Sequence, residues 1–220
     1  MLLTDEIEAV LTNNGLVKHS SSVGICEPKS NALGRGHVDY SYKCSNLTVS
    51  DGVITVNRVA DNSGDSSYNC VNVITTTNQS CLGPVKMPGY VYTDSFSGCV
   101  FYLYQNVRHV IGVHAHQGLD DVKTTERYGP FKLKKRVINA QVRKEYGPTE
   151  YMATLALKRL CRHETRGQLT DEEKVGSQGA LAFLSCVELT HATTFLYSYV
   201  LRPGEGYRVL RLVNKFVNRY

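Results

Sequence analysis

Segments in which apolar and polar residues alternate, rich in β-branched and aromatic side chains, dominate both ends of the 220-residue chain. They cover residues 37–44, 47–59, 68–77, 180–190, 193–202 and 207–217. Ser50–Gly52 and residues 203–206 supply turn signals between neighbouring segments. Because each such segment predicts a strand with one buried face, we predict an α+β fold with a mixed or antiparallel β-sandwich-like core and flanking helices.

A short amphipathic helix is predicted over residues 4–13. Thr4 or Asp5 would open this helix, with Glu8 in the capping-box position, and the helix would end near Gly15. The helix is expected to serve packing.

Three further segments have distinct local signals. Residues 20–36 mix Ser, Gly, Pro and Asn without periodicity, which predicts an irregular loop or leader. Residues 83–89 contain two prolines and two glycines and are expected to form a loop. Residues 149–162 place apolar side chains on one face and basic ones near the end, so they predict the one substantial helix.

The composition favours one core of ordinary size, because 42% of the residues are hydrophobic. We therefore expect a single catalytic domain over residues 1–220, with residues 1–36 as helix and leader, acting as a monomer. The net charge of +5 favours acidic partners without requiring them, and no nucleic-acid partner is expected. The N-terminus lacks a secretory signal pattern, and no apolar run is long enough to suggest a membrane partner.

No cofactor or metal is expected from the motifs. The seven cysteines include no CxxC pair, which removes the usual spacing of zinc and thioredoxin-type sites, and six of them are interpreted as small buried hydrophobes. Carboxylate clusters at Asp120–Asp121 and 171–173 are explained by solvation or helix capping. Dinucleotide and phosphate-loop fingerprints do not occur after a strand.

One predicted hairpin carries a cysteine and a histidine that could act together. A four-residue loop from Gln105 to Arg108 would pair Cys99 with His114, with Cβ atoms about 4.5–5.5 Å apart. His116 would lie on the same face one pair further out, and His109 on the other face. An imidazole within hydrogen-bonding reach favours the thiolate, so Cys99 is a candidate nucleophile and His114 its base.

The residues before the cysteine suit a nucleophile. Gly98 lets the backbone approach a substrate closely, and the amides of Ser97, Gly98 and Cys99 could hold a developing oxyanion. The alternative is that Gly98 and Cys99 only fill a tight bulge where the strand begins. A chain with seven cysteines and seven histidines also offers such a pair by chance.

Residues 93–99, Thr-Asp-Ser-Phe-Ser-Gly-Cys, followed by His114, resemble the catalytic signature of the glutamine deamidases. This group includes the cytotoxic necrotizing factor catalytic domain, Burkholderia lethal factor and the chemoreceptor deamidases. The resemblance covers residues 91–116 and implies a β-sandwich with flanking helices. It implies that Cys99 attacks a glutamine carboxamide, that His114 activates the thiol and protonates ammonia, and that Thr93 orients the histidine.

The resemblance also implies a partner and a place of action. The relatives modify host proteins such as Rho-family GTPases, or bacterial chemoreceptors, so a protein substrate is expected. A toxin or effector secreted without a classical signal peptide and acting in the host cytosol is the favoured interpretation, with a cytoplasmic enzyme as the alternative. His116 stays a rival to His114 as the base.

Two rival functions stay open at the level of sequence. The same Cys–His site would serve a transglutaminase or a cysteine protease, since all three reactions share a thioester intermediate. A non-catalytic binding module is the alternative from another class, with the basic stretch 132–144 and exposed tyrosines as its interface.

Overall fold

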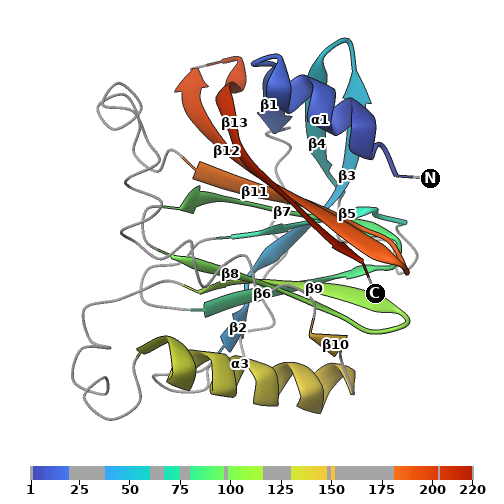
Figure 1. The fold of residues 1–220 in the computed structure, drawn as a ribbon, viewed down its shortest axis with the longest axis vertical. Helices are drawn as coiled ribbons and strands as arrows, with labels where there is room; N and C mark the ends of the chain where they lie inside the picture. Colours follow the sequence, from blue (N-terminus) through green and yellow to red (C-terminus); the bar gives the residue numbers. More distant parts are fainter. Residues whose placement is uncertain are drawn as a thin grey trace.

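Strands make up most of the computed structural model, which describes residues 2–19, 38–59, 67–74, 80–96, 99–115, 130–147, 150–151, 181–202 and 204–219 (Figure 1). The elements are α1 (Thr4–Thr12), β1 (Leu16–His19), β2 (Val38–Tyr40), β3 (Tyr42–Ser50), β4 (Val53–Arg58), β5 (Cys70–Val73), β6 (Ser80–Lys86), β7 (Gly89–Phe96), β8 (Val100–Gln105), β9 (His109–Ala115), α3 (Pro130–Tyr146), β10 (Glu150–Tyr151), β11 (Leu181–Val187), β12 (His191–Arg202) and β13 (Gly206–Arg219). The predicted α+β class, with many strands and few helices, is confirmed at this level.

The strands form a closed barrel and a separate five-stranded sheet. The barrel order is β1-β13-β12-β11-β7-β5-β3-β4, and the order of the five-stranded sheet is β10-β8-β9-β6-β2. The predicted β-sandwich is therefore wrong. The cause is β1, which pairs in parallel with β4 and antiparallel with β13 and so joins the two edges of what would otherwise be an open sheet.

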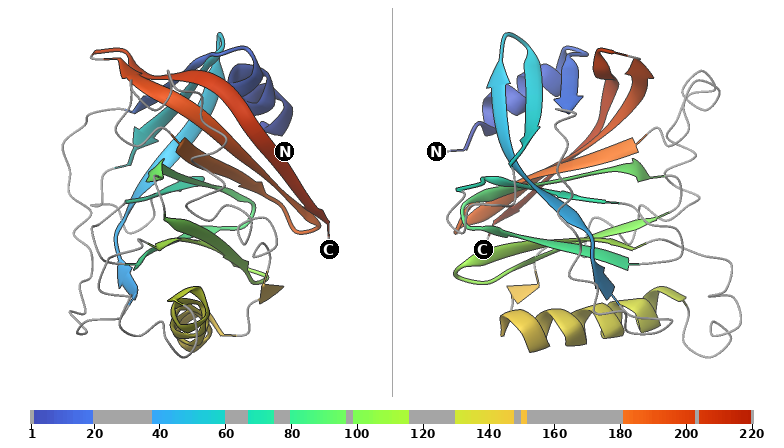
Figure 2. Two further views of the ribbon diagram at one scale, coloured as in Figure 1. Left: turned by 60° about the vertical axis from the view of Figure 1, so that its left-hand side comes forward. Right: turned by 180° about the vertical axis from the view of Figure 1, so that it is seen from behind.

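The molecule has three layers, and the five-stranded sheet lies in the middle between the barrel and α3 (Figures 1 and 2). We call β5, β7 and β11 the barrel wall, because these strands pack against the five-stranded sheet. Side chains of the wall alternate between two cores. Tyr90 and Tyr92 of β7 lie in the barrel core, whereas Val91 belongs to the core between the wall and the five-stranded sheet.

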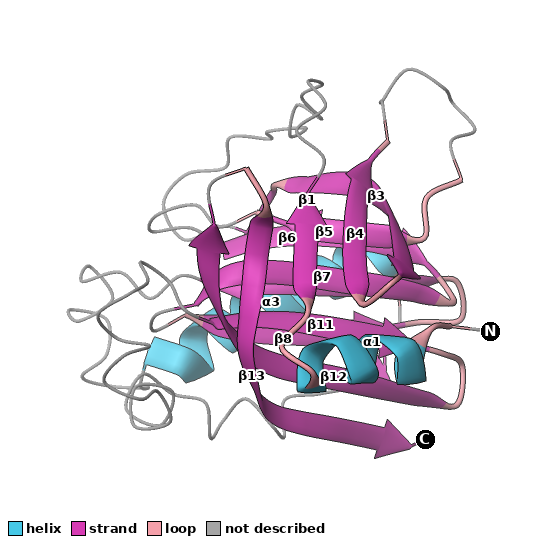
Figure 3. Ribbon diagram, turned by 90° about the horizontal axis from the view of Figure 1, so that it is seen from above, coloured by secondary structure: helices cyan, strands magenta, loops and turns pink. Residues whose placement is uncertain are grey.

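Helix α1 lies against the barrel (Figure 3). It supplies Ile7, Val10 and Leu11 to the barrel core. The predicted helix is thus confirmed, but its predicted cap is wrong. The N-cap residue is Leu3, whose side chain makes no capping bond. Instead, the Leu3 N–H donates to the Tyr90 hydroxyl at 2.8 Å, so tertiary contacts with the barrel fix the start of the helix.

The hairpin between β3 and β4 follows the prediction. Ser50 pairs with Val53, and Asp51 and Gly52 between them have φ angles of 51° and 73°. Both positive angles are those of a type I′ turn, for which Asp-Gly is a favoured sequence. The three predicted C-terminal strands are also present as β11, β12 and β13.

The loop predicted over residues 83–89 is shortened to Met87 and Pro88, because Gly83 and Pro84 lie within β6 and Gly89 begins β7. A Cβ on Gly83 would lie 2.7 Å from Tyr42 Cβ, so this glycine allows close packing rather than a turn. Strand β2 pairs with β6 from Ser80 to Leu82, and Pro84 lies beyond that stretch, where its missing N–H is tolerated.

The prediction of a helix over residues 149–162 is wrong for the two residues of that segment that the structure describes. Glu150 and Tyr151 form β10, which pairs with β8, and the other residues of that segment lie outside the described ranges. The basic segment before it contains helix α3, which the sequence analysis did not predict. Its described apolar face contributes Ile138 and Val142 to the core. The predicted leader at residues 20–36 also lies outside the described ranges.

Among the described residues, no helix combines the length and the apolar character that crossing a membrane requires.

Candidate active site

Thr93, Cys99 and His114 come from three strand segments that meet between the barrel wall and the five-stranded sheet. Thr93 lies on β7, His114 on β9, and Cys99 directly precedes β8. Their relative exposures are 0% for Thr93, 1% for His114 and 7% for Cys99. A polar pair this deep in an apolar core is costly unless its members hydrogen-bond to each other.

Thr93 and His114 are joined by a hydrogen bond across the two layers. The distance from Thr93 Oγ1 to His114 Nδ1 is 2.8 Å, and that from Thr93 Oγ1 to the Val73 carbonyl oxygen is 2.9 Å. A carbonyl oxygen only accepts, so the single hydroxyl proton of Thr93 goes to Val73. Thr93 must then accept from His114 Nδ1–H, which places the lone pair of the neutral ring on Nε2. This is the tautomer that a general base acting through Nε2 requires.

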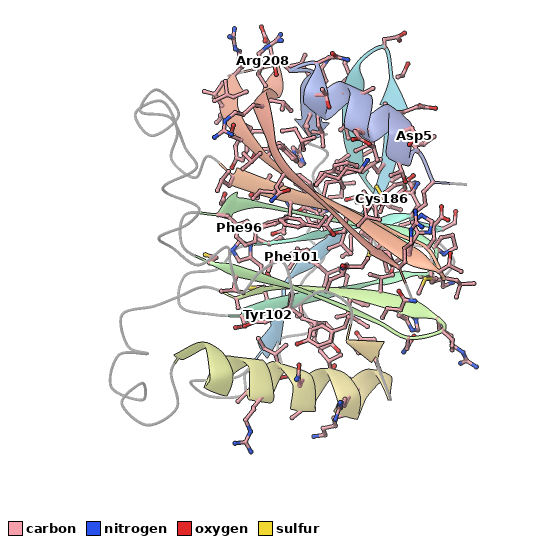
Figure 4. All side chains as sticks on the ribbon, in the orientation of Figure 1. Asp5, Phe96, Phe101, Tyr102, Cys186 and Arg208 are labelled. Atoms are coloured by element: carbon pink, nitrogen blue, oxygen red, sulfur yellow. The ribbon has the colours of Figure 1, made fainter. Side chains whose placement is uncertain are left out.

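Phe96 fixes the plane of the His114 ring. The two rings stack with centroids 4.0 Å apart and an interplanar angle of 16°. Phe183 of β11 packs edge-on against Phe96 at 4.8 Å and stacks on Phe101 of β8 at 5.2 Å, so an aromatic cluster fills the space between the layers (Figure 4). With one ring nitrogen bonded and one face stacked, the imidazole has a single orientation.

The β8–β9 hairpin is present, but its predicted register is wrong. Asn106 N–H donates to the His109 carbonyl oxygen at 2.9 Å, so the turn consists of Val107 and Arg108 rather than of four residues. The Asn106 side chain explains the tighter turn, because its Oδ1 accepts from the N–H groups of Arg108 at 2.8 Å and of His109 at 2.7 Å.

The shorter turn shifts the partner of every residue in the hairpin by two positions. Phe101, not Cys99, lies directly opposite His114. Cys99 directly precedes β8. Extending the alternation of β8 by this one residue puts Cys99 on the face of Phe101 and diagonal to His114, an arrangement in which Cβ atoms are typically about 7–8 Å apart. A long ring such as imidazole still spans that diagonal. On that extension the predicted nucleophile and base would share a face as a diagonal pair, not as directly opposite residues.

A second cysteine lies beside the same histidine. Cys81 of β6 is directly opposite His114 on the other side of β9 and is fully buried. The sequence analysis treated Cys81 as a small buried hydrophobe, and its position in the middle of a sheet agrees with that role. Cys99, at the start of a strand and 7% exposed, is the more accessible of the two thiols.

The remaining predicted site residues lie outside the described ranges or away from the site. Ser97, Gly98 and His116 fall outside the described residues. His109 lies at the far end of β9, where it pairs with Lys86 and packs against Tyr146 with ring centroids 5.8 Å apart. This agrees with its predicted place on the face of the hairpin opposite to that of His114.

The Phe96 stack and the Val73 carbonyl were not predicted from the sequence. Phe96 is visible in the motif between Thr93 and Cys99, but simple alternation puts it on the opposite face from Thr93. Val73 is on another strand and contributes only its backbone, so side-chain patterns carry no signal for it.

Two other buried thiols lie in the barrel core and not beside His114. Burial raises the pKa of Cys186 to about 12, with nearby Glu188 adding to the rise against a bond from Thr4. Burial likewise raises the pKa of Cys70 far above its ordinary range. Both thiols belong to the barrel core and are protonated at neutral pH, so they are poor nucleophiles.

In comparisons with known proteins, the chain matches no family model, no curated protein and no solved structure.

Proposed function

We propose that this protein is a cysteine-dependent protein glutamine deamidase in which Cys99 is the nucleophile, His114 the base and Thr93 the residue that orients the base. The observation that carries the proposal is the Thr93–His114 hydrogen bond of 2.8 Å. The motif resemblance assigns those two residues to each other, and the bond fixes the tautomer that such chemistry uses.

The reaction would proceed in two halves. His114 Nε2 takes the proton of the Cys99 thiol, and the thiolate attacks the side-chain carbonyl carbon of glutamine. The tetrahedral intermediate collapses as His114 returns the proton to the departing ammonia, which leaves a thioester. Water, deprotonated by His114, then hydrolyses the thioester and gives glutamate and the regenerated thiol. The amides of Ser97, Gly98 and Cys99 are the candidate oxyanion donors.

The burial of the site favours a side-chain amide over a peptide bond. His114 is 1% exposed and Cys99 7%, which leaves little room beside them for a bulky substrate group. A glutamine side chain is long, thin and ends in the reacting carboxamide. A peptide bond brings chain on both sides and needs an open groove, so proteolysis fits less well. Transglutamination shares the first half-reaction and differs only in the acceptor.

The partner class follows from the resemblance and the charge. We propose a host regulatory protein such as a Rho-family GTPase as the substrate, with the protein acting as a toxin or effector in the host cytosol. Helix α3 contributes exposed Arg136, Arg143 and Lys144, which suit an acidic substrate surface.

The test is mass spectrometry of candidate substrate proteins incubated with the wild-type chain or with Cys99→Ala. Conversion of one amide to an acid adds about one dalton. A gain of that size at one glutamine, present with the wild type and lost with Cys99→Ala, supports deamidation. A larger gain that requires an added primary amine identifies a transglutaminase.

Controls separate the site from general effects. Cys186→Ala removes a thiol from the barrel core and should leave the conversion intact. Cleavage products that depend on Cys99 would instead show a protease. If no candidate substrate or amide peptide library is modified in a Cys99-dependent way, the enzymatic proposal gives way to a binding module.

A further inference from the structure

A bulge in β7 aims Phe96 at His114. On β11, Leu181 and Phe183 are two residues apart, but their partners on β7 are Phe96 and Thr93, three residues apart. One extra residue is therefore accommodated at Asp94–Ser95. Without it, alternation would send Phe96 into the barrel, away from Thr93 and from His114.

The bulge requires a backbone conformation that serine rarely adopts. Ser95 has a φ of +62°, in the left-handed region that costs energy for a residue with a Cβ. Such a conformation persists only where surrounding contacts hold it. The described neighbours of Ser95 supply those contacts from inside the barrel.

Two hydrogen bonds hold the strained residue. The Ser95 N–H donates to the Tyr199 hydroxyl of β12 at 3.2 Å, and the Ser95 hydroxyl donates to Asp94 Oδ1 at 2.9 Å. The second carboxylate oxygen of Asp94 accepts from the Tyr92 hydroxyl at 3.1 Å. His19 Nε2 lies 3.1 Å from that same hydroxyl, so the network reaches β1 on the far side of the barrel.

The network is set in an aromatic environment that stiffens it. Tyr207 lies between His19 and Tyr199, with ring centroids 4.9 Å and 4.6 Å away respectively. Tyr199 is 4% exposed, and burial followed by the nearby Asp94 raises its pKa to about 12. The hydroxyl that accepts from Ser95 is thus neutral and fixed over the ordinary pH range.

We propose that Tyr199 and Asp94 are positioning residues for the reaction at Cys99: from the barrel core they hold the Ser95 bulge, which keeps Phe96 stacked on His114. This inference rests on the proposed function for its kinetic consequence, but its structural part concerns only the His114 ring. The proposal links the hydrogen bonds inside the barrel to the His114 ring on the other face of the barrel wall. The link is made by residues 94–96 of β7.

The test uses Tyr199→Phe, which keeps the ring and removes the hydroxyl. Its matched control is Tyr90→Phe, which removes a hydroxyl on β7 that accepts from Leu3 N–H, away from the bulge. Two quantities are measured: the ring-proton chemical shifts of His114 by NMR, and kcat and KM for glutamine deamidation. Near-ultraviolet circular dichroism and Tm establish that each variant is folded.

Tyr199→Phe is expected to shift the His114 ring protons downfield, because they lose the shielding of the stacked Phe96 ring, and to lower kcat about tenfold with KM within about twofold. Tyr90→Phe should change neither quantity. Adding Ser95→Gly to Tyr199→Phe should restore both, because glycine adopts a positive φ without the hydroxyl's support. A second variant, Asp94→Asn, should change the ring-proton chemical shifts of His114 in the same direction by a smaller amount.

The two readouts separate the two possible failures. Unchanged His114 shifts in folded Tyr199→Phe and Asp94→Asn overturn the positioning role, whatever the activity. An equal shift in Tyr90→Phe also overturns it, since the effect would then be a general one. If the wild type deamidates nothing while Tyr199→Phe still moves His114 and Ser95→Gly restores it, the proposed function fails and the structural coupling stands.

Discussion

The two faces of the barrel wall are built from the same strands and differ in how they use polar groups. The face toward the five-stranded sheet carries Thr93 beside His114, enclosed by phenylalanines. The face toward the barrel interior carries Tyr92 and Asp94, joined to tyrosines from other strands. The face toward the five-stranded sheet has one polar pair in apolar surroundings, which suits the proposed reaction. The face toward the barrel interior has a hydrogen-bond network of several polar side chains, which suits a structural role.

The comparison shows why a single register defect matters. Regular alternation along β7 would assign every residue to one face or the other. The bulge at Asp94–Ser95 breaks this rule once, and Phe96 thereby joins Thr93 on the face toward the five-stranded sheet. The hydrogen-bond network inside the barrel and the proposed active site on the other face of the wall are connected at that point.

The largest expected effect is that of removing Cys99, and Cys81, the other thiol beside His114, is its control. Cys99→Ala should lower the rate of deamidation by about 10⁴-fold or more, because it removes the nucleophile. Cys81→Ala should cost about 1–2 kcal/mol of stability through a small cavity and leave kcat nearly unchanged. Single-turnover mass spectrometry of a glutamine substrate measures the first, and urea unfolding measures the second. The reverse result would make Cys81 the nucleophile.

Thr93→Val should have the next largest effect. The methyl group keeps the shape but leaves the His114 Nδ1–H and the Val73 carbonyl buried without the hydroxyl, at a cost of about 1–3 kcal/mol. If that cost falls on the transition state, kcat/KM drops about 10–100-fold. Thr93→Ser retains the hydroxyl and should lose far less. Equal losses in the two variants would show that only packing matters at this position.

The barrel face should respond to alkaline pH. Burial and Asp94 raise the pKa of Tyr199 to about 12, whereas an unfolded tyrosine titrates near pH 10. Above pH 10 the unfolded chain loses this proton first, so the stabilisation is complete below pH 10 and is lost as pH rises toward 12, by about 2–3 kcal/mol. Urea unfolding from pH 9 to 12 should show that the free energy of unfolding declines less in Tyr199→Phe than in the wild type. Parallel curves for the two proteins would refute the assignment.

The contact between the wall and the five-stranded sheet is tested by Gly112→Ala. A Cβ at this position of β9 would lie 2.3 Å from Val91 Cγ1 of the wall, which predicts about 1–3 kcal/mol of destabilisation and a weakened Thr93–His114 bond. Gly52→Ala is the control, since its Cβ meets open space and only its φ of +73° costs energy, about 1 kcal/mol. Gly112→Ala should have both a lower Tm and a lower deamidation rate than Gly52→Ala. Activity that is equally unaffected by the two substitutions would contradict the account.

The sequence predicted the strands well but not how the sheet closes. The alternation that identified β11, β12 and β13 reports which face is buried, and this is the same in a sandwich and in a barrel. Closure depends on β1, a strand of four residues, too short to give a period of its own. Helix α3 was missed because six of its 17 residues are lysine or arginine, which obscure the apolar positions at Ile138 and Val142.

The candidate site was predictable as a set of residues and not as a geometry. Thr93, Cys99 and His114 could be named from a motif, but the register depended on the Asn106 side chain, which shortens the turn. The Phe96 stack depended on a bulge held by Tyr199, a residue more than a hundred positions further along the chain. Such long-range contacts are not encoded in local periodicity.

The most direct test of the central claim, that His114 activates Cys99, is the alkylation rate of each cysteine in the native protein. Isotope-coded iodoacetamide at pH 7, read by mass spectrometry, gives the rates for the wild type and for His114→Gln. The account predicts that Cys99 reacts faster than Cys81 and Cys186 and slows about tenfold or more in His114→Gln. A Cys99 that reacts no faster than these buried thiols, or at the same rate without His114, would contradict it.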